Sequence, residues 1–303
     1  MKRSILFILS LFALATVYAQ QDPLYSQYIN NPLVLNPAYA GLTNNLNLSL
    51  NYRSQWAGYE GSPKTLNANV HTSLLKNKMG LGLMAISDKI GNVNTSEVVA
   101  VYSYHINVTS DKILSFGLQG GMSSYKIDNS KVNPYDASDP LFQGSLNEMK
   151  PTLGFGVILK NDKFFVSASL PRMLKSTVNI LGENTSLHTQ HFYLMGSYIF
   201  FLSERIRFKP AALLKVVSGA PASVDLNASL ILFENYQVGL LTRDFHTNGL
   251  FMQALLKDKF RVGYVIEVPT SSSVGTRFLT HELTLGFRMN VLSFHNNSGV
   301  LSF

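Results

Sequence analysis

The sequence lacks cysteine and, beyond its first twenty positions, any long apolar run, and each absence restricts what the protein can be. With no Cys among 303 residues, the chain has neither disulfides nor the lipid-bearing cysteine of a lipoprotein. No uninterrupted apolar stretch after the first twenty residues approaches the ~20 residues of a spanning helix. Charged residues make up only 14% of the chain and hydrophobic residues 46%. Apolar residues spread in short alternating segments are typical of a barrel wall. No stretch has the composition of a linker, which favours a single domain.

Apolar and polar residues alternate in about fourteen segments of roughly ten residues between Leu46 and Asn290. In the first segment, Leu48, Leu50 and Tyr52 are each followed by a polar residue. Successive side chains of a strand point to opposite faces, so each segment has one apolar and one polar face. The expected strands are residues 46–56, 65–75, 79–87, 95–107, 112–125, 150–160, 163–170, 188–201, 205–217, 222–232, 236–243, 249–257, 259–267 and 280–290.

The connections favour a transmembrane barrel over a soluble sandwich, whose strands would alternate in the same way. After every second strand the connection is tight, as at residues 76–78, 109–111 and 161–162. The others are longer, at 57–64, 87–94, 126–149, 171–187 and 269–279, with only 218–221 short. Outer-membrane barrels have short periplasmic turns and longer extracellular loops. An even strand count places both chain termini in the periplasm. The sequence therefore predicts an all-β protein, an outer-membrane antiparallel β-barrel of about 14 strands over residues 46–290.

The first residues have the pattern of a secretory signal peptide. Lys2 and Arg3 precede an apolar run over residues 5–17, which is followed by Val17-Tyr18-Ala19. This small-residue pattern predicts cleavage after Ala19 and a signal peptide over residues 1–19. An uncleaved membrane anchor is the alternative, although the run is short. The signal and the barrel together predict an outer-membrane location.

Residues 20–45, between the signal peptide and the barrel, have no strand period. Pro23, Pro32 and Pro37 would interrupt a helix or a strand ladder, and the pairs Asn31-Pro32 and Asn36-Pro37 favour turns. The leucines and tyrosines of this segment nevertheless favour burial. We therefore expect an irregular plug-like segment in or under the barrel, with a disordered periplasmic leader as the alternative. A C-terminal tail over residues 291–303 follows the last strand.

We expect no catalytic, cofactor-binding or metal site and no enzyme activity. His188 and His191 lie three apart, which on a strand places them on opposite faces. The acidic residues of the 126–149 loop lack the spacing of an EF-hand and are expected to be solvated. The formal net charge is +7, and the basic residues are scattered, which favours a polar, hydrated lumen and lipid headgroup contacts over nucleic-acid binding.

The segment that opens the mature chain carries a family resemblance. Its motifs are Asp22-Pro23, Tyr25-Ser26-Gln27-Tyr28, Asn31-Pro32, Asn36-Pro37-Ala38-Tyr39-Ala40-Gly41, Tyr52-Arg53-Ser54-Gln55-Trp56 and Pro63-Lys64-Thr65. They resemble the opening of the PorP/SprF family of type IX secretion system membrane proteins. The resemblance implies an outer-membrane protein of the export and gliding machinery, which supports secretion or surface anchoring of a particular adhesin. It also implies contact with periplasmic components of that machinery.

The candidate plug and partner residues follow from these motifs: Asp22, Pro23, Tyr25, Gln27, Tyr28, Asn31, Pro32, Asn36, Pro37, Tyr39, Gly41, Arg53, Gln55 and Trp56. By strand parity Arg53 faces the lumen, where it would clamp the plug. Trp56 falls at the outer interface, where it would either belong to an aromatic belt or pack beside Arg53 and Gln55.

We further expect the 126–149 and 171–187 loops to hold the adhesin, while the 21–41 segment and the periplasmic turns contact the machinery. The alternative function is an outer-membrane transporter for small or hydrophobic solutes. A third class, an outer-membrane enzyme, would hydrolyse lipid. Two signals for recognition by the barrel-assembly machinery are alternatives: the terminal Phe303, or the internal strand that ends at Met289.

Overall fold

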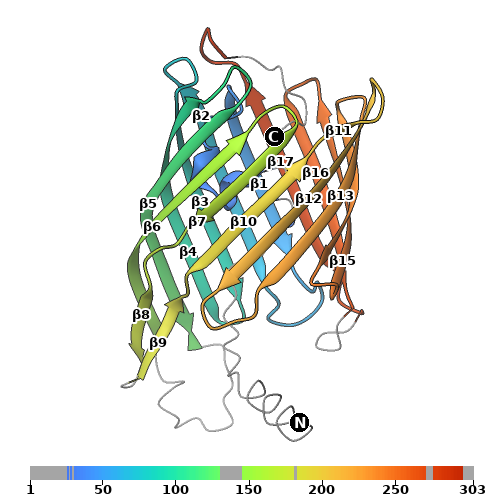
Figure 1. Ribbon diagram of the computed structural model, residues 1–303. Helices are drawn as coiled ribbons and strands as arrows, with labels where there is room; N and C mark the ends of the chain where they lie inside the picture. Colours follow the sequence, from blue (N-terminus) through green and yellow to red (C-terminus); the bar gives the residue numbers. More distant parts are fainter. Residues whose placement is uncertain are drawn as a thin grey trace, which may run out of the picture.

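The computed structural model describes residues 26, 28, 31–129, 145–180, 183–270 and 276–295. They form a closed antiparallel barrel of 14 strands, as predicted (Figure 1). One barrel strand is interrupted at Ile199 and has two parts, β10 and β11. The barrel strands are β1 (Leu46–Ser54), β2 (Lys64–Leu74), β3 (Met79–Ile90), β4 (Val93–Asn107), β5 (Ile113–Asp128), β6 (Ser145–Lys160), β7 (Phe164–Leu170), β10 (His191–Tyr198), β11 (Phe200–Phe201), β12 (Ile206–Val217), β13 (Ser223–Leu232), β14 (Tyr236–Arg243), β15 (Thr247–Leu256), β16 (Phe260–Pro269) and β17 (Thr280–Met289).

The first and last strands close the sheet. Leu46 of β1 lies opposite Met289 of β17, and this pairing continues to Ser54 opposite His281. The sheet is continuous elsewhere because β10 pairs with both β7 and β12. Closure pairs the backbone groups of the wall, which an open sheet edge would leave unsatisfied in hydrocarbon.

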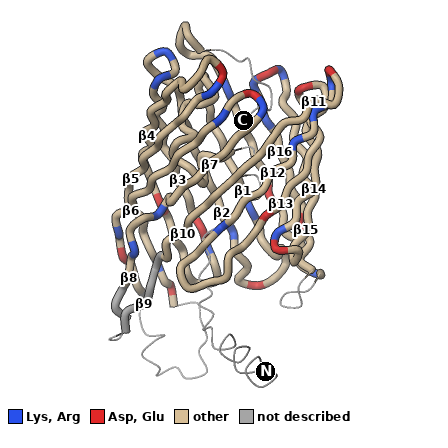
Figure 2. The backbone as a smooth tube through the Cα atoms, in the orientation of Figure 1, with Lys and Arg blue, Asp and Glu red and all other residues tan. Residues whose placement is uncertain are grey.

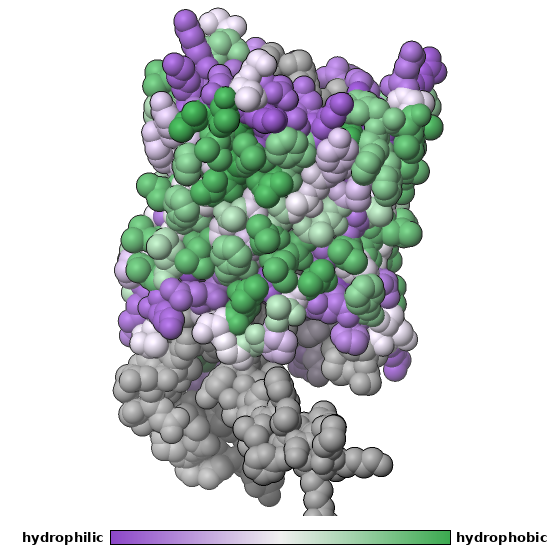
Figure 3. Space-filling view, in the orientation of Figure 1, coloured by the Kyte–Doolittle hydropathy of each residue, from purple (hydrophilic) through white to green (hydrophobic). Residues whose placement is uncertain are grey.

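The alternation in the sequence corresponds to the two faces of the wall. On β1, Leu48, Leu50 and Tyr52 are exposed on the outer surface, whereas Asn51 and Arg53 are buried in the interior. Figure 3 shows the result on one face of the molecule as an apolar band between two polar rims. Many charged residues lie toward the two rims (Figure 2), and several of those within the strands, such as Arg53, Lys209 and Glu267, are buried. None of the helical segments among the described residues is long and apolar enough to cross a membrane.

The two ends of the barrel differ, and we name them by their connections. The short-turn end has the turns at 75–78, 108–112, 161–163, 202–205, 233–235 and 257–259, together with Leu46 and Met289. The long-loop end carries the other connections, including the hairpin of β8 (Ser176–Ile180) and β9 (Glu183–His188), at the bottom of Figure 1. By the general rule for outer-membrane barrels, the short-turn end faces the periplasm.

Several expected boundaries at the long-loop end were wrong. Residues 171–187 are not only a loop, because they contain the β8–β9 hairpin. β3 and β4 leave only residues 91–92 between them, and β5 and β6 extend to Asp128 and from Ser145. Short connections therefore occur at 91–92 and 244–246 as well as at 218–222. β1 ends at Ser54, two residues earlier than predicted. The errors arise because polar residues in these extended strand ends give no apolar alternation.

Candidate functional site

The lumen contains the described residues that precede β1: Ser26, Tyr28 and residues 31–45, which we call the plug segment. It includes two short 3-10 helices, η3 (Pro32–Val34) and η4 (Pro37–Tyr39), shown in blue inside the barrel in Figure 1. Its residues from Asn31 to Leu42 are all buried. The predicted plug-like segment therefore lies in the lumen, enclosed by the barrel wall.

The plug segment runs through the lumen from the long-loop end to the short-turn end. Its first described residue contacts the wall near the long-loop end, whereas the contacts from Asn31 onward all lie within four residues of the short-turn ends of their strands. The successive hydrogen-bonded pairs are Ser26 with Arg53, Asn31 with Ser49, Asn36 with Ser167, Ala38 with Ser115 and Ala40 with Ser103. The chain then enters β1 at the short-turn end.

Asn36 fixes both the local turn and its place on the wall. Its Oδ1 accepts a hydrogen bond from the backbone N–H of Ala38 at 2.9 Å, which caps η4 in front of Pro37. Its Nδ2 donates to Ser167 Oγ at 2.7 Å and to the carbonyls of Val157 and Ala168, both at 3.1 Å. The side-chain amide of Asn36 thus accepts the free backbone N–H at the start of η4 and also attaches the turn to β6 and β7.

Glycines on the inner face of the wall make room for the plug segment. A Cβ on Gly80, Gly117 or Gly156 would collide with Ala40, with Pro37 and Ala38, or with Asn36. Gly41 has φ +72° and packs against the backbone of β2 and β3, and its N–H donates to His71 Nδ1 at 3.1 Å. These positions accept only glycine at the observed approach.

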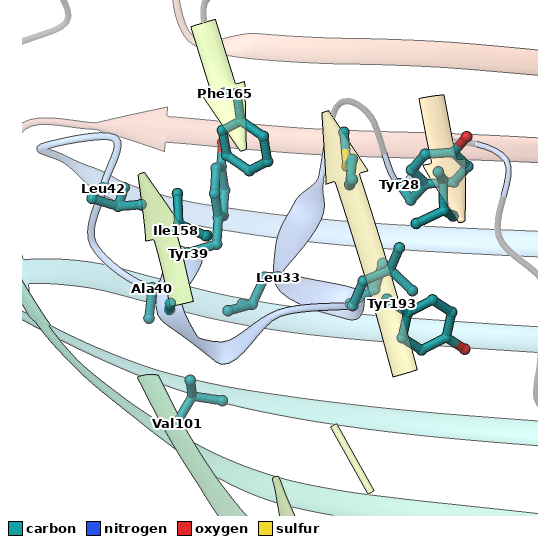
Figure 4. Close-up of a cluster of buried hydrophobic side chains, with 14 of the residues drawn as sticks. Tyr28, Leu33, Tyr39, Ala40, Leu42, Val101, Ile158, Phe165 and Tyr193 are labelled. Carbon is teal, nitrogen blue, oxygen red and sulfur yellow. The ribbon is translucent and has the colours of Figure 1, made fainter. Parts of the chain in front are cut away.

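An apolar cluster holds the middle of the plug segment, as Figure 4 shows. Leu33 and Ala40 are fully buried, and Tyr39 packs edge-on against Phe165 and His71, with ring centroids 6.5 and 5.7 Å apart. The wall contributes apolar interior residues from β3, β4, β6, β7, β10 and β12: Met84, Ile86, Val99, Val101, Ile158, Phe165, Tyr193, Met195, Ala211 and Leu213.

The expectation of a polar, hydrated lumen was therefore wrong for this half of the barrel, which packs against the plug segment. Polar side chains line the opposite half, on β1, β2 and β13–β17. Their amides include Asn51, Asn67, Asn227, Gln237 and Gln253.

Buried charges hold the segment near the long-loop end. Arg53 Nη2 lies 2.7 Å from Glu267 Oε2, and its Nη1 lies 3.0 Å from Glu282 Oε2. Nη1 also donates to Ser26 Oγ at 3.0 Å, while the Ser26 N–H donates to Glu282 at 2.8 Å and its hydroxyl donates to Glu267. Beside this group, Arg243 pairs with Asp225 at 2.9 Å. We call these five charged residues the ion cluster; they lie on β1, β13, β14, β16 and β17, and Ser26 of the plug segment adds hydrogen bonds to three of them.

The sequence matches the family model of the type IX secretion system membrane protein PorP/SprF over residues 17–287. The chain belongs to the PorP/SprF family. This match covers the plug segment and nearly all of the barrel.

Solved structures share the fold of this PorP/SprF protein at low sequence identity. The Ralstonia pickettii toluene transporter TbuX has a TM-score of 0.51 and 9% identity, with 85% of this chain and 92% of that chain covered. The P. putida toluene transporter TodX gives 0.51 and 9%, covering 87% and 95%. A Pseudomonas aeruginosa FadL homologue gives 0.50 and 8%, covering 83% and 92%. No curated protein matches the sequence.

The structure brings together only part of the candidate set. Tyr28, Asn31, Pro32, Asn36, Pro37, Tyr39 and Gly41 are buried in the lumen, and Arg53 faces them from β1. Asp22, Pro23, Tyr25 and Gln27 lie outside the described residues, as do the predicted signal peptide and residues 296–303.

Gln55 and Trp56 lie in the connection after β1, at the rim of the long-loop end. Trp56 has φ +52°, and its N–H donates to Thr280 Oγ1 at 3.2 Å. The Gln55 N–H donates to the carbonyl of Pro63 at 2.9 Å. The backbones of both residues thus order the rim connection rather than the plug segment.

Sequence reasoning missed the acidic partners of Arg53 and the close approach of the plug segment to Gly80 and Gly156. Parity along β16 and β17 places Glu267 and Glu282 on the lumen face, and this signal was available. The role of Gly80 and Gly156 depends on the path of the plug segment, which no local pattern gives. In the tail, His295 folds back to the barrel, where its Nε2 lies 3.0 Å from the carbonyl oxygen of Ser73.

Proposed function

We propose that this PorP/SprF protein is a closed outer-membrane platform of the type IX secretion machinery that supports secretion or surface anchoring of one adhesin. Family membership carries the proposal. The occupied lumen supports a platform and not an open channel, because the plug segment is packed against the wall over most of its length. In this proposal cargo passes beside the barrel or is held by it, and not through it.

The long-loop end is where we place the adhesin. β5 and β6 pair beyond the last residue of β7, with Gly121 opposite Thr152 and Asp128 opposite Ser145. β4 stays paired with β5 up to Val93 opposite Ile127, so this extension belongs to a taller part of the wall, and it lies on the same side of the barrel as the β8–β9 hairpin (Figure 1). Together they offer a raised surface on the outer side, where a secreted protein would be held.

The short-turn end is where we place the periplasmic machinery. This end presents the tight turns and the start of β1, which residues 42–45 of the plug segment join. The sequence led us to assign the whole 21–41 segment to periplasmic contacts. The start of that segment lies at the opposite end, at Ser26, so only its last residues are placed for such a contact.

Comparative surface proteomics on cells with and without the gene tests this function. We expect loss of one large protein with a type IX C-terminal signal from the deletion strain, with other secreted cargo at normal levels. Complementation with the wild-type chain should restore it. An unchanged surface together with altered uptake of small or hydrophobic solutes would contradict the proposal and favour a transporter.

A further inference from the structure

The outer surface of the long-loop end carries a row of lysines. Lys64, Lys89 and Lys126 are exposed and lie in one row across β2–β5. Lys64 pairs directly with Lys89, Lys89 with Asn94, and Asn94 with Lys126. Like charges directly opposite on neighbouring strands destabilise a sheet. None of the three lysines has an ion-pair partner in the part of the chain that the structure describes.

The row borders a cavity of about 870 Å³ at the rim, whose lining also includes Tyr59, Glu60 and Asp128. The position is the headgroup level of the outer leaflet, beside the apolar band. We propose that this cavity binds the phosphate of a lipid headgroup, whose negative charge relieves the repulsion between the lysines. The carboxylates of Glu60 and Asp128 at its edge would bind a cation or accept hydrogen bonds from headgroup hydroxyls.

The test compares lipid A retained by the full chain after purification from outer membranes. We expect the triple variant K64Q/K89Q/K126Q to retain several-fold less than wild type. The control K76Q/K78Q/K163Q removes three exposed lysines from the short-turn end and should retain the wild-type amount. Equal retention by both triple variants would overturn the proposal. Displacement of lipid A by millimolar inorganic phosphate would also overturn it, in favour of a free-anion site.

Discussion

Arg53 joins the plug segment to the barrel wall at the scale of one residue. Its guanidinium contacts two carboxylates and the hydroxyl of Ser26, and all of these groups are buried. Removing one partner of a buried ion pair typically costs 3–5 kcal/mol, because the other charge stays uncompensated. Arg53 thus neutralises two buried carboxylates of the wall and at the same time holds Ser26 of the plug segment.

Arg53→Ala should release the start of the plug segment and raise the conductance of the reconstituted barrel. We expect about 3–5 kcal/mol of destabilisation, seen as a lower temperature for the heat-modifiable gel transition. Arg205→Ala, at an exposed position in the turn 202–205, is the control and should leave both readouts unchanged. Wild-type conductance in R53A would show that Arg53 does not hold the plug.

Gly117→Ala tests the close approach of the plug segment to β5. The added methyl group would collide with the backbone of Pro37 and Ala38, so the segment must shift. We expect faster proteolysis within residues 31–45 of the purified barrel and a destabilisation of about 1–3 kcal/mol. Gly196→Ala adds the same group to β10, where nothing lies within 4 Å, and should behave as wild type. Equal proteolysis of the two variants would contradict the packing described here.

At the scale of elements, the strands were predictable from sequence because the two faces of the wall meet different surroundings. The positions of all fourteen barrel strands follow from alternation and from tight charged turns such as 161–163. The β8–β9 hairpin was not predictable, because it is polar and lies outside the membrane. The apolar inner faces of strands such as β4, with Val99 and Val101, are explained only by the plug segment that covers them.

The β8–β9 hairpin should be dispensable for the barrel but needed for the adhesin. It forms a separate two-stranded sheet, so the pairings of β7 and β10 do not depend on it. We expect a chain with residues 176–188 replaced by Gly-Gly to show normal heat-modifiable mobility and reduced adhesin display. Replacing residues 244–246, at the same end, by a Gly-rich turn is the control. Full display by the hairpin variant would place the adhesin contact elsewhere.

At the scale of the whole molecule, the plug segment occupies the lumen, and the proposed platform works without opening it. The plug segment is attached at the long-loop end by the ion cluster, in the middle by the apolar cluster, and near the short-turn end by Ser103 and His71. Its path across the whole lumen depends on contacts between residues more than 100 positions apart, such as Asn36 with Ser167. No local sequence pattern encodes such contacts, so the direction of the segment required the structure.

The most direct test locks the plug segment to the wall and asks whether the platform still works. The side chains of Asn36 and Ser167 are in contact, with 2.7 Å between Nδ2 and Oγ, and the chain has no other cysteine to interfere. The oxidising envelope permits disulfides, and non-reducing gel mobility would establish whether N36C/S167C forms one before display is scored. The single variants N36C and S167C control for the lost hydrogen bonds.

We would measure surface display of the adhesin in cells that express the cross-linked protein. The account predicts display equal to that of the single variants, because the barrel does not need to open. Loss of display in the cross-linked protein, restored by a reductant, would contradict it and show that the plug segment must leave the lumen.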